Sequence, residues 1–147
     1  MPWIYLILAL IAGAMIPIQS ALNNKLAAHL QSPVLSAFVS FAVGLLGLFL
    51  YILASRIPFS QLSGLKNATP VTLLGGLCGA FFVTAAVITV PRLGIALTFS
   101  ILILGQMLIT LPIDHFGLLG VPVKEINLPR LLGVLLVIAG VIIIRRF

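Results

Sequence analysis

The chain has 147 residues, of which 62% are apolar and only 7% are charged. Soluble domains are ~45–50% apolar and ~25% charged, so this composition excludes an ordinary soluble domain and predicts a protein of the lipid bilayer. The net charge of +6 arises from eight basic and two acidic residues. The sequence has no nucleotide-binding loop, nucleophile elbow or metal-ligand spacing. We therefore expect no enzyme, no cofactor or metal, and no nucleic-acid partner.

Five apolar runs lie between the charged positions, and each is long enough to cross a hydrocarbon core of about 30 Å as a helix. We expect an all-α integral membrane protein with a single five-helix transmembrane domain over residues 1–147. The first helix is expected to be retained, because it lacks the basic start of a signal peptide. The expected helices cover residues 2–23, 33–55, 70–90, 93–113 and 128–144. A tight Pro91-Arg92 turn would join the third helix to the fourth.

The basic residues divide equally between the two membrane sides that five spans define. One side holds Arg56, Lys66, Lys124 and Arg130, and the other holds Lys25, Arg92, Arg145 and Arg146. Orientation follows an excess of Lys and Arg on the cytoplasmic side. The balance therefore predicts insertion in both orientations, unless it is a chance result in a chain with so few basic residues.

A chain that inserts both ways can pair with an inverted copy of itself, which gives the in-plane two-fold axis found in many transporters. The expected assembly is thus an antiparallel homodimer in the bilayer, and a separate, oppositely oriented homologous subunit is the alternative partner. Gly133 and Gly140 lie seven residues apart on nearly one face of the fifth helix, which marks the expected dimer seam.

Small residues at helical spacing predict close helix packing in the membrane. In the second helix these are Ser36, Ser40 and Gly44, and in the third they are Gly75 and Gly79 of a GxxxG pattern. For each of them, contact between helices is the favoured interpretation over contact with a ligand.

Polar side chains recur every four residues along one side of two helices. Gln19 and Asn23 follow Pro17 in the first helix, and Gln106, Thr110 and Asp114 follow one another in the fourth. Amides facing hydrocarbon would lack partners, so a solute-lined cavity is one interpretation. Gln19, Asn23, Gln106 and Thr110 are the predicted substrate-binding residues. A purely structural hydrogen bond between helices is the alternative for Gln106.

Three ionisable residues are candidates for gating or coupling. Asp114 and His115 come where the fourth helix is expected to end, and His titrates near neutrality. Arg92 lies in the predicted tight turn and cannot be neutralised. The alternatives are a solvated helix terminus for the first pair and contact with lipid headgroups for Arg92.

The segments GAMIPIQSALNNKL, GGLCGAFFVTAAVITVPRLGIALT, ILGQMLITLPIDHFGLLGVP and RLLGVLLVIAGV resemble the YdcZ-like half-size branch of the drug/metabolite transporter superfamily. The resemblance covers nearly the whole chain. It implies a multi-pass bacterial inner-membrane protein whose five helices form antiparallel dimers equivalent to the ten-helix transporters of that superfamily. It also implies that family members occur as single dual-topology chains, as paired subunits or as fusions.

The fifth helix is similar to the dimerisation helix of small multidrug resistance proteins through Gly133, Leu136, Val137, Gly140 and Val141. This similarity assigns those five residues to the dimer interface. The small multidrug resistance proteins bind cations with a glutamate in their first helix, where this chain offers Gln19 instead.

These observations predict a dual-topology transporter subunit that moves a small polar solute, neutral or anionic, by alternating access at an antiparallel dimer interface. The alternatives are an exporter of cationic compounds, a lipid scrambler or pore, and a non-transporting membrane scaffold.

Overall fold

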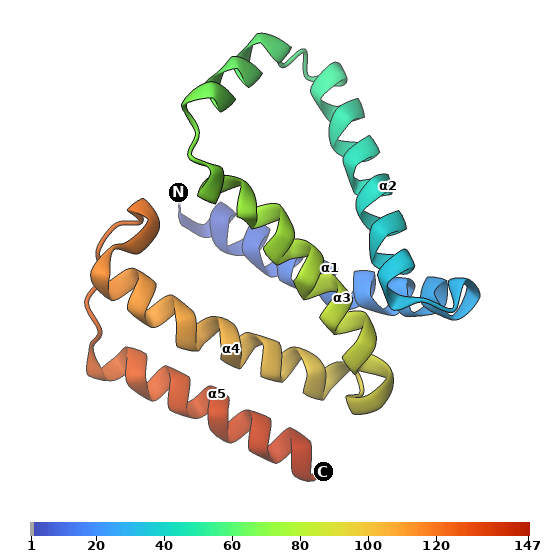
Figure 1. The fold of residues 1–147 in the computed structure, drawn as a ribbon. Coiled ribbons are helices and arrows are strands. Elements are labelled where there is room, and N and C mark those ends of the chain that lie inside the picture. Colours follow the sequence, from blue (N-terminus) through green and yellow to red (C-terminus); the bar gives the residue numbers. More distant parts are fainter. Residues whose placement is uncertain (1) are drawn as a thin grey trace. The chain divides into compact units, whose positions relative to one another are not determined.

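The computed structural model describes residues 2–147 and contains five α-helices (Figure 1). All five are long and apolar enough to cross a membrane, which confirms the all-α membrane class. The helices are α1 (Pro2–Leu30), α2 (Pro33–Ala54), α3 (Leu74–Leu93), α4 (Ile95–Phe116) and α5 (Leu128–Arg146). Three short 3-10 helices lie in the connections, namely η1 (Phe59–Asn67), η2 (Pro70–Leu73) and η3 (Leu118–Gly120).

Several helix boundaries differ from the expected ones by a few residues, and two of the differences have clear local reasons. Helix α1 continues past residue 23 to Leu30, because Lys25 and the polar residues around it fit a helix surface as well as a loop. The predicted Pro91-Arg92 turn is wrong. Helix α3 runs through both residues to Leu93, and the chain turns at Gly94, whose φ of +80° favours glycine.

Interhelical contacts divide the chain into two units, Met1–Pro91 and Arg92–Phe147. In the first unit, α1 and α2 pack together next to their short connection (Figure 1). Ser32 caps α2 by accepting a hydrogen bond from the Leu35 N–H at 3.2 Å, and Pro33 begins the helix. A small core of Ala37, Val83 and Val87 joins α2 to α3.

The small residues of α2 and α3 have different surroundings within the chain. Ser36 is fully buried, and Gly79 approaches the Phe41 ring, since a Cβ at Gly79 would lie 3.6 Å from that ring. A Cβ at Gly44 or Gly75 would meet no atom within 4 Å. Among the described residues 2–147 neither glycine meets a neighbouring helix, so close packing at these two positions stays a prediction.

In the second unit, α4 and α5 form an antiparallel hairpin (Figure 1). Helix α4 ends at Phe116, and the next residue, Gly117, caps it with a left-handed φ of +59°. Asn127 caps α5 by accepting a hydrogen bond from the Arg130 N–H at 3.0 Å. Val134 is the buried side chain of α5.

Large apolar side chains remain on the outside of the helices in both units. Leu10 is 74% exposed, Phe81 is 76% exposed and Leu136 is 74% exposed. Water would oppose such a surface, whereas hydrocarbon does not. The lipid bilayer is therefore the solvent that these helices require.

Candidate functional site

A cavity of about 380 Å³ lies between α1 and α2 in the first unit. It begins beside Pro17, which has no N–H and so leaves the carbonyl of Gly13 without its helical partner. The lining residues are Met15, Ile16, Ile18, Gln19, Leu22, Asn23 and Ser40. Its volume falls within the range of small-molecule sites.

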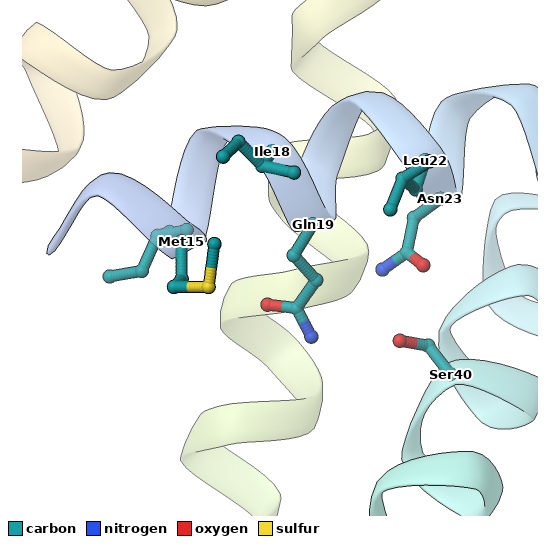
Figure 2. A pocket seen from close by; sticks show the side chains of 7 residues that line it. Met15, Ile18, Gln19, Leu22, Asn23 and Ser40 are labelled. Carbon is teal, nitrogen blue, oxygen red and sulfur yellow. The ribbon is translucent and has the colours of Figure 1, made fainter. Parts of the chain in front are cut away.

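Three neutral polar side chains line this cavity, and they range from exposed Gln19 through half-buried Ser40 to buried Asn23. Figure 2 shows Gln19 and Asn23 extending from α1 towards Ser40 on α2. The structure therefore places two of the predicted substrate-binding residues together. It adds Ser40, which the sequence pattern assigned to helix packing. The sequence could have indicated Ser40 as a binding residue, because it lies one turn after Ser36 on the face of α2 that turns towards α1.

Asn23 is the most buried of the three polar groups, with 5% of its surface exposed. Its side-chain nitrogen has no hydrogen-bond partner among the described residues 2–147. A buried donor without a partner costs about 1–3 kcal/mol, so a folded protein seldom retains one without a reason. This nitrogen has no accessible surface, so Asn23 contributes to the cavity wall without presenting this donor to the cavity.

The backbone around Asn23 is held in place from α2. The Ser36 hydroxyl donates a hydrogen bond of 2.6 Å to the Asn23 carbonyl oxygen, and both residues are buried. On the next position of α1, the Asn24 amide donates to the Ser20 carbonyl at 2.9 Å and is thereby satisfied. The contrast between these neighbouring asparagines identifies Asn23 as the one with unused hydrogen-bonding capacity.

The other two predicted substrate-binding residues lie in the second unit, on α4. Thr110 donates a hydrogen bond of 2.7 Å to the Gln106 carbonyl oxygen one turn earlier, so its hydroxyl proton is used within the helix. The side chain of Gln106 is exposed. Their participation in a solute site stays a prediction.

Asp114 and His115 hold the connection between α4 and α5. The Asp114 carboxylate accepts from the Arg130 guanidinium at 2.9 Å, with the two side chains 23% and 30% exposed respectively. The same guanidinium donates to the Lys124 carbonyl at 3.0 Å, and the Lys124 N–H donates to the Asp114 carbonyl at 2.8 Å. Sequence reasoning missed this pairing, although Asp114 and Arg130 stand at the two ends of one connection.

His115 contributes a second tie to this connection. Its Nδ1 accepts a hydrogen bond from the Ile126 N–H at 3.2 Å, and its ring lies edge-on to Phe116 at a centroid distance of 4.7 Å. Arg92 is exposed in the last turn of α3. A cation is favourable near the C-terminus of a helix, so this position needs no ligand to explain it.

The predicted dimer residues of α5 divide between two faces. Val137, Gly140 and Val141 line a cavity of about 220 Å³ together with Ser100 and Ile103 of α4, and thus face their own hairpin. Gly133 and Leu136 are exposed. Gly133 and Leu136 therefore do not line this cavity between α4 and α5.

Helices of this length and composition, with exposed apolar faces and a neutral polar cavity, define a multi-pass membrane protein. Residues 4–143 match the family model described as "Putative inner membrane exporter, YdcZ". The chain belongs to this YdcZ family, and its place is the bacterial inner membrane.

Part of the chain is also similar to a protein of Escherichia coli. The chain is 35% identical over 75 residues to the protein named "Inner membrane protein YdcZ" of Escherichia coli (strain K12), a match that covers 51% of this chain and 50% of the relative. The matched region thus spans about half the length of that relative. No solved structure matches the chain.

Proposed function

We propose that the chain is one half of a transporter that moves a small polar solute, neutral or anionic, across the inner membrane by alternating access. The observation that carries this proposal is the cavity between α1 and α2, which Gln19, Asn23 and Ser40 line with neutral polar side chains beside four apolar residues. Membership of an exporter family supports transport in general. None of the seven described lining residues is a carboxylate that could neutralise a cation, which favours a neutral or anionic solute over a cation.

The other half is proposed to be an inverted copy of the same chain. The equal division of basic residues between the two membrane sides supports insertion in both orientations. An antiparallel pair exchanges its two protomer conformations symmetrically, so each access state is the other turned over. Gly133 and Leu136 on the exposed face of α5 are the proposed contact between copies.

Flux through proteoliposomes tests the transport function. The probes are labelled N-acetyl-leucinamide, which is neutral, N-acetyl-leucine, which is anionic at neutral pH, and tetraphenylphosphonium, which is a cation. We expect saturable flux of the neutral or the anionic probe above that of protein-free liposomes. Flux of the cation alone would indicate a cationic-drug exporter, and flux that does not saturate would indicate a pore; either result contradicts the proposal.

A further inference from the structure

We infer that the 3-10 helix η1, together with Arg56 just before it, is a docking surface for anionic phospholipid at the membrane–water interface. The inference is independent of the proposed transport function and concerns how the chain binds its bilayer. It is carried by an apolar stripe along η1, by two cations beside this stripe and by the backbone conformation of Arg56.

The sequence of η1 places its apolar residues on one face. A 3-10 helix has three residues per turn, so side chains three positions apart lie above one another. Phe59, Leu62 and Leu65 follow this spacing and form the apolar stripe, and they are 48%, 59% and 55% exposed. The other two faces carry Ser60, Ser63 and Lys66, and Gln61, Gly64 and Asn67. Helix η1 is therefore amphipathic, which is the property of helices that lie in the membrane interface.

The apolar stripe turns back towards the membrane-spanning helix α2. The ring of Phe59 lies near the ring of Phe49 in α2, with a centroid distance of 6.1 Å. Leu62 and Ile52 of α2 line one open hollow of about 180 Å³. Only residues 55–58 separate the end of α2 from η1, and a connection this short keeps η1 at the membrane surface. The stripe is therefore placed to meet lipid acyl chains.

Two cations accompany the apolar stripe. Arg56 precedes η1 and Lys66 lies in its last turn, and both are exposed. The two acidic residues of the chain, Asp114 and Glu125, lie outside the unit Met1–Pro91 that contains η1. Each Lys or Arg near a membrane surface adds to its attraction for anionic lipids. The charge of this segment is thus complementary to a phospholipid headgroup with a net negative charge.

The backbone of Arg56 gives an independent argument for its side chain. Helix α2 ends in a Schellman motif, in which the Arg56 N–H donates to the Leu53 carbonyl at 3.2 Å and the Ile57 N–H donates to the Ile52 carbonyl at 3.1 Å. Arg56 occupies the left-handed position of this motif with a φ of +52°, where glycine is the usual residue. Arginine is unfavourable for this backbone, so we attribute its presence to its charged side chain.

Spin-label accessibility tests where the apolar stripe lies. The full chain carries Cys78→Ala, which removes its one cysteine, and a label at Leu62→Cys or, as the matched control, at the adjacent Ser63→Cys. In mixed vesicles of dioleoylphosphatidylcholine and dioleoylphosphatidylglycerol, we expect oxygen dissolved in the hydrocarbon to relax the first label and a water-soluble nickel chelate to relax the second. Access of the chelate to both labels would place the segment in water. Access of neither reagent to the first label would show that protein covers the stripe, and either result overturns the inference.

Substitution of Arg56 tests the cation. Arg56→Gly suits the left-handed backbone, so its melting temperature in lipid-free detergent should not fall. The concentration of dioleoylphosphatidylglycerol that gives half of the maximal thermal stabilisation should rise about fivefold, because one cation is lost, and Lys66→Gln should raise it by a similar factor. The matched control is Arg56→Lys, which keeps the charge and should keep the native value. An unchanged value for Arg56→Gly, or equal stabilisation of the native chain by dioleoylphosphatidylcholine, would overturn the inference.

Discussion

Polar residues that lie close together in the sequence of a helix differ in their hydrogen-bond partners. Asn23 and Asn24 are adjacent and chemically identical, yet one lines a cavity without a partner and the other is bonded to its own helix. Ser36 and Ser40 differ in the same way, since Ser36 secures α1 to α2 and Ser40 faces the cavity. The neighbours that the fold places around each side chain therefore decide its role.

The Ser36 hydrogen bond is expected to hold α1 against α2. Ser36→Ala removes the donor that contacts the Asn23 carbonyl at 2.6 Å in a buried setting, so the free energy of unfolding should fall by about 1 kcal/mol. Thermal unfolding in detergent measures the change. The control is Ser100→Ala, whose hydroxyl bonds a carbonyl of its own helix and should matter little. Equal effects of the two substitutions would contradict the assigned contact.

At the scale of the elements, the connection between α4 and α5 is built by backbone geometry and one ion pair. Gly117 turns the chain, Asn127 starts the next helix, and the guanidinium of Arg130 reaches back to Asp114. The positions of Gly117 and Asn127 are readable as helix stop and start signals. The ion pair between Asp114 and Arg130 has no such sequence signal, because it depends on the conformation of the residues between them.

The ion pair should stabilise the α4–α5 hairpin. Its partial burial places it between exposed pairs and buried ones, so a double-mutant cycle of Asp114→Asn and Arg130→Gln should give a coupling energy of about 1–2 kcal/mol. Lys124→Gln is the control, because Lys124 joins this network through its backbone alone. Additive effects of the two single substitutions would show that the pair contributes nothing.

Gly117 is expected to be essential to the turn after α4. An added Cβ would lie 2.8 Å from Cγ2 of Val123 and would occupy a left-handed conformation, so Gly117→Ala should destabilise the protein by about 1–3 kcal/mol. Gly105→Ala provides the comparison, since a Cβ there meets no atom within 4 Å. The melting temperature should fall for the first variant only, and a comparable fall for both would refute the turn argument.

At the scale of the whole molecule, the distribution of charge governs how the chain enters the membrane. Four basic residues on each side predict no preferred orientation, and the proposed inverted pair depends on this prediction. The apolar faces that remain exposed on the helices leave surface for both lipid and a second copy.

Reporter fusions to the C-terminus in intact cells measure this orientation. We expect reporters active on both sides of the membrane for the native sequence. Replacing Arg145 and Arg146 by glutamine leaves an excess of basic residues on the opposite side, so the C-terminus should shift to the periplasm. A single fixed orientation of the native chain, unaltered by the substitutions, would contradict dual insertion.

The sequence by itself determined the membrane class and the five helices, because the cost of burying charges and backbone polar groups in hydrocarbon leaves few other solutions. It also indicated Gln19 and Asn23 as polar positions on one face of α1. Only the tertiary structure decided that Ser40 joins them, that Arg130 pairs with Asp114, and that Val137 and Val141 face α4. Helical periodicity specifies which residues share a face, whereas the packing of helices specifies what that face meets.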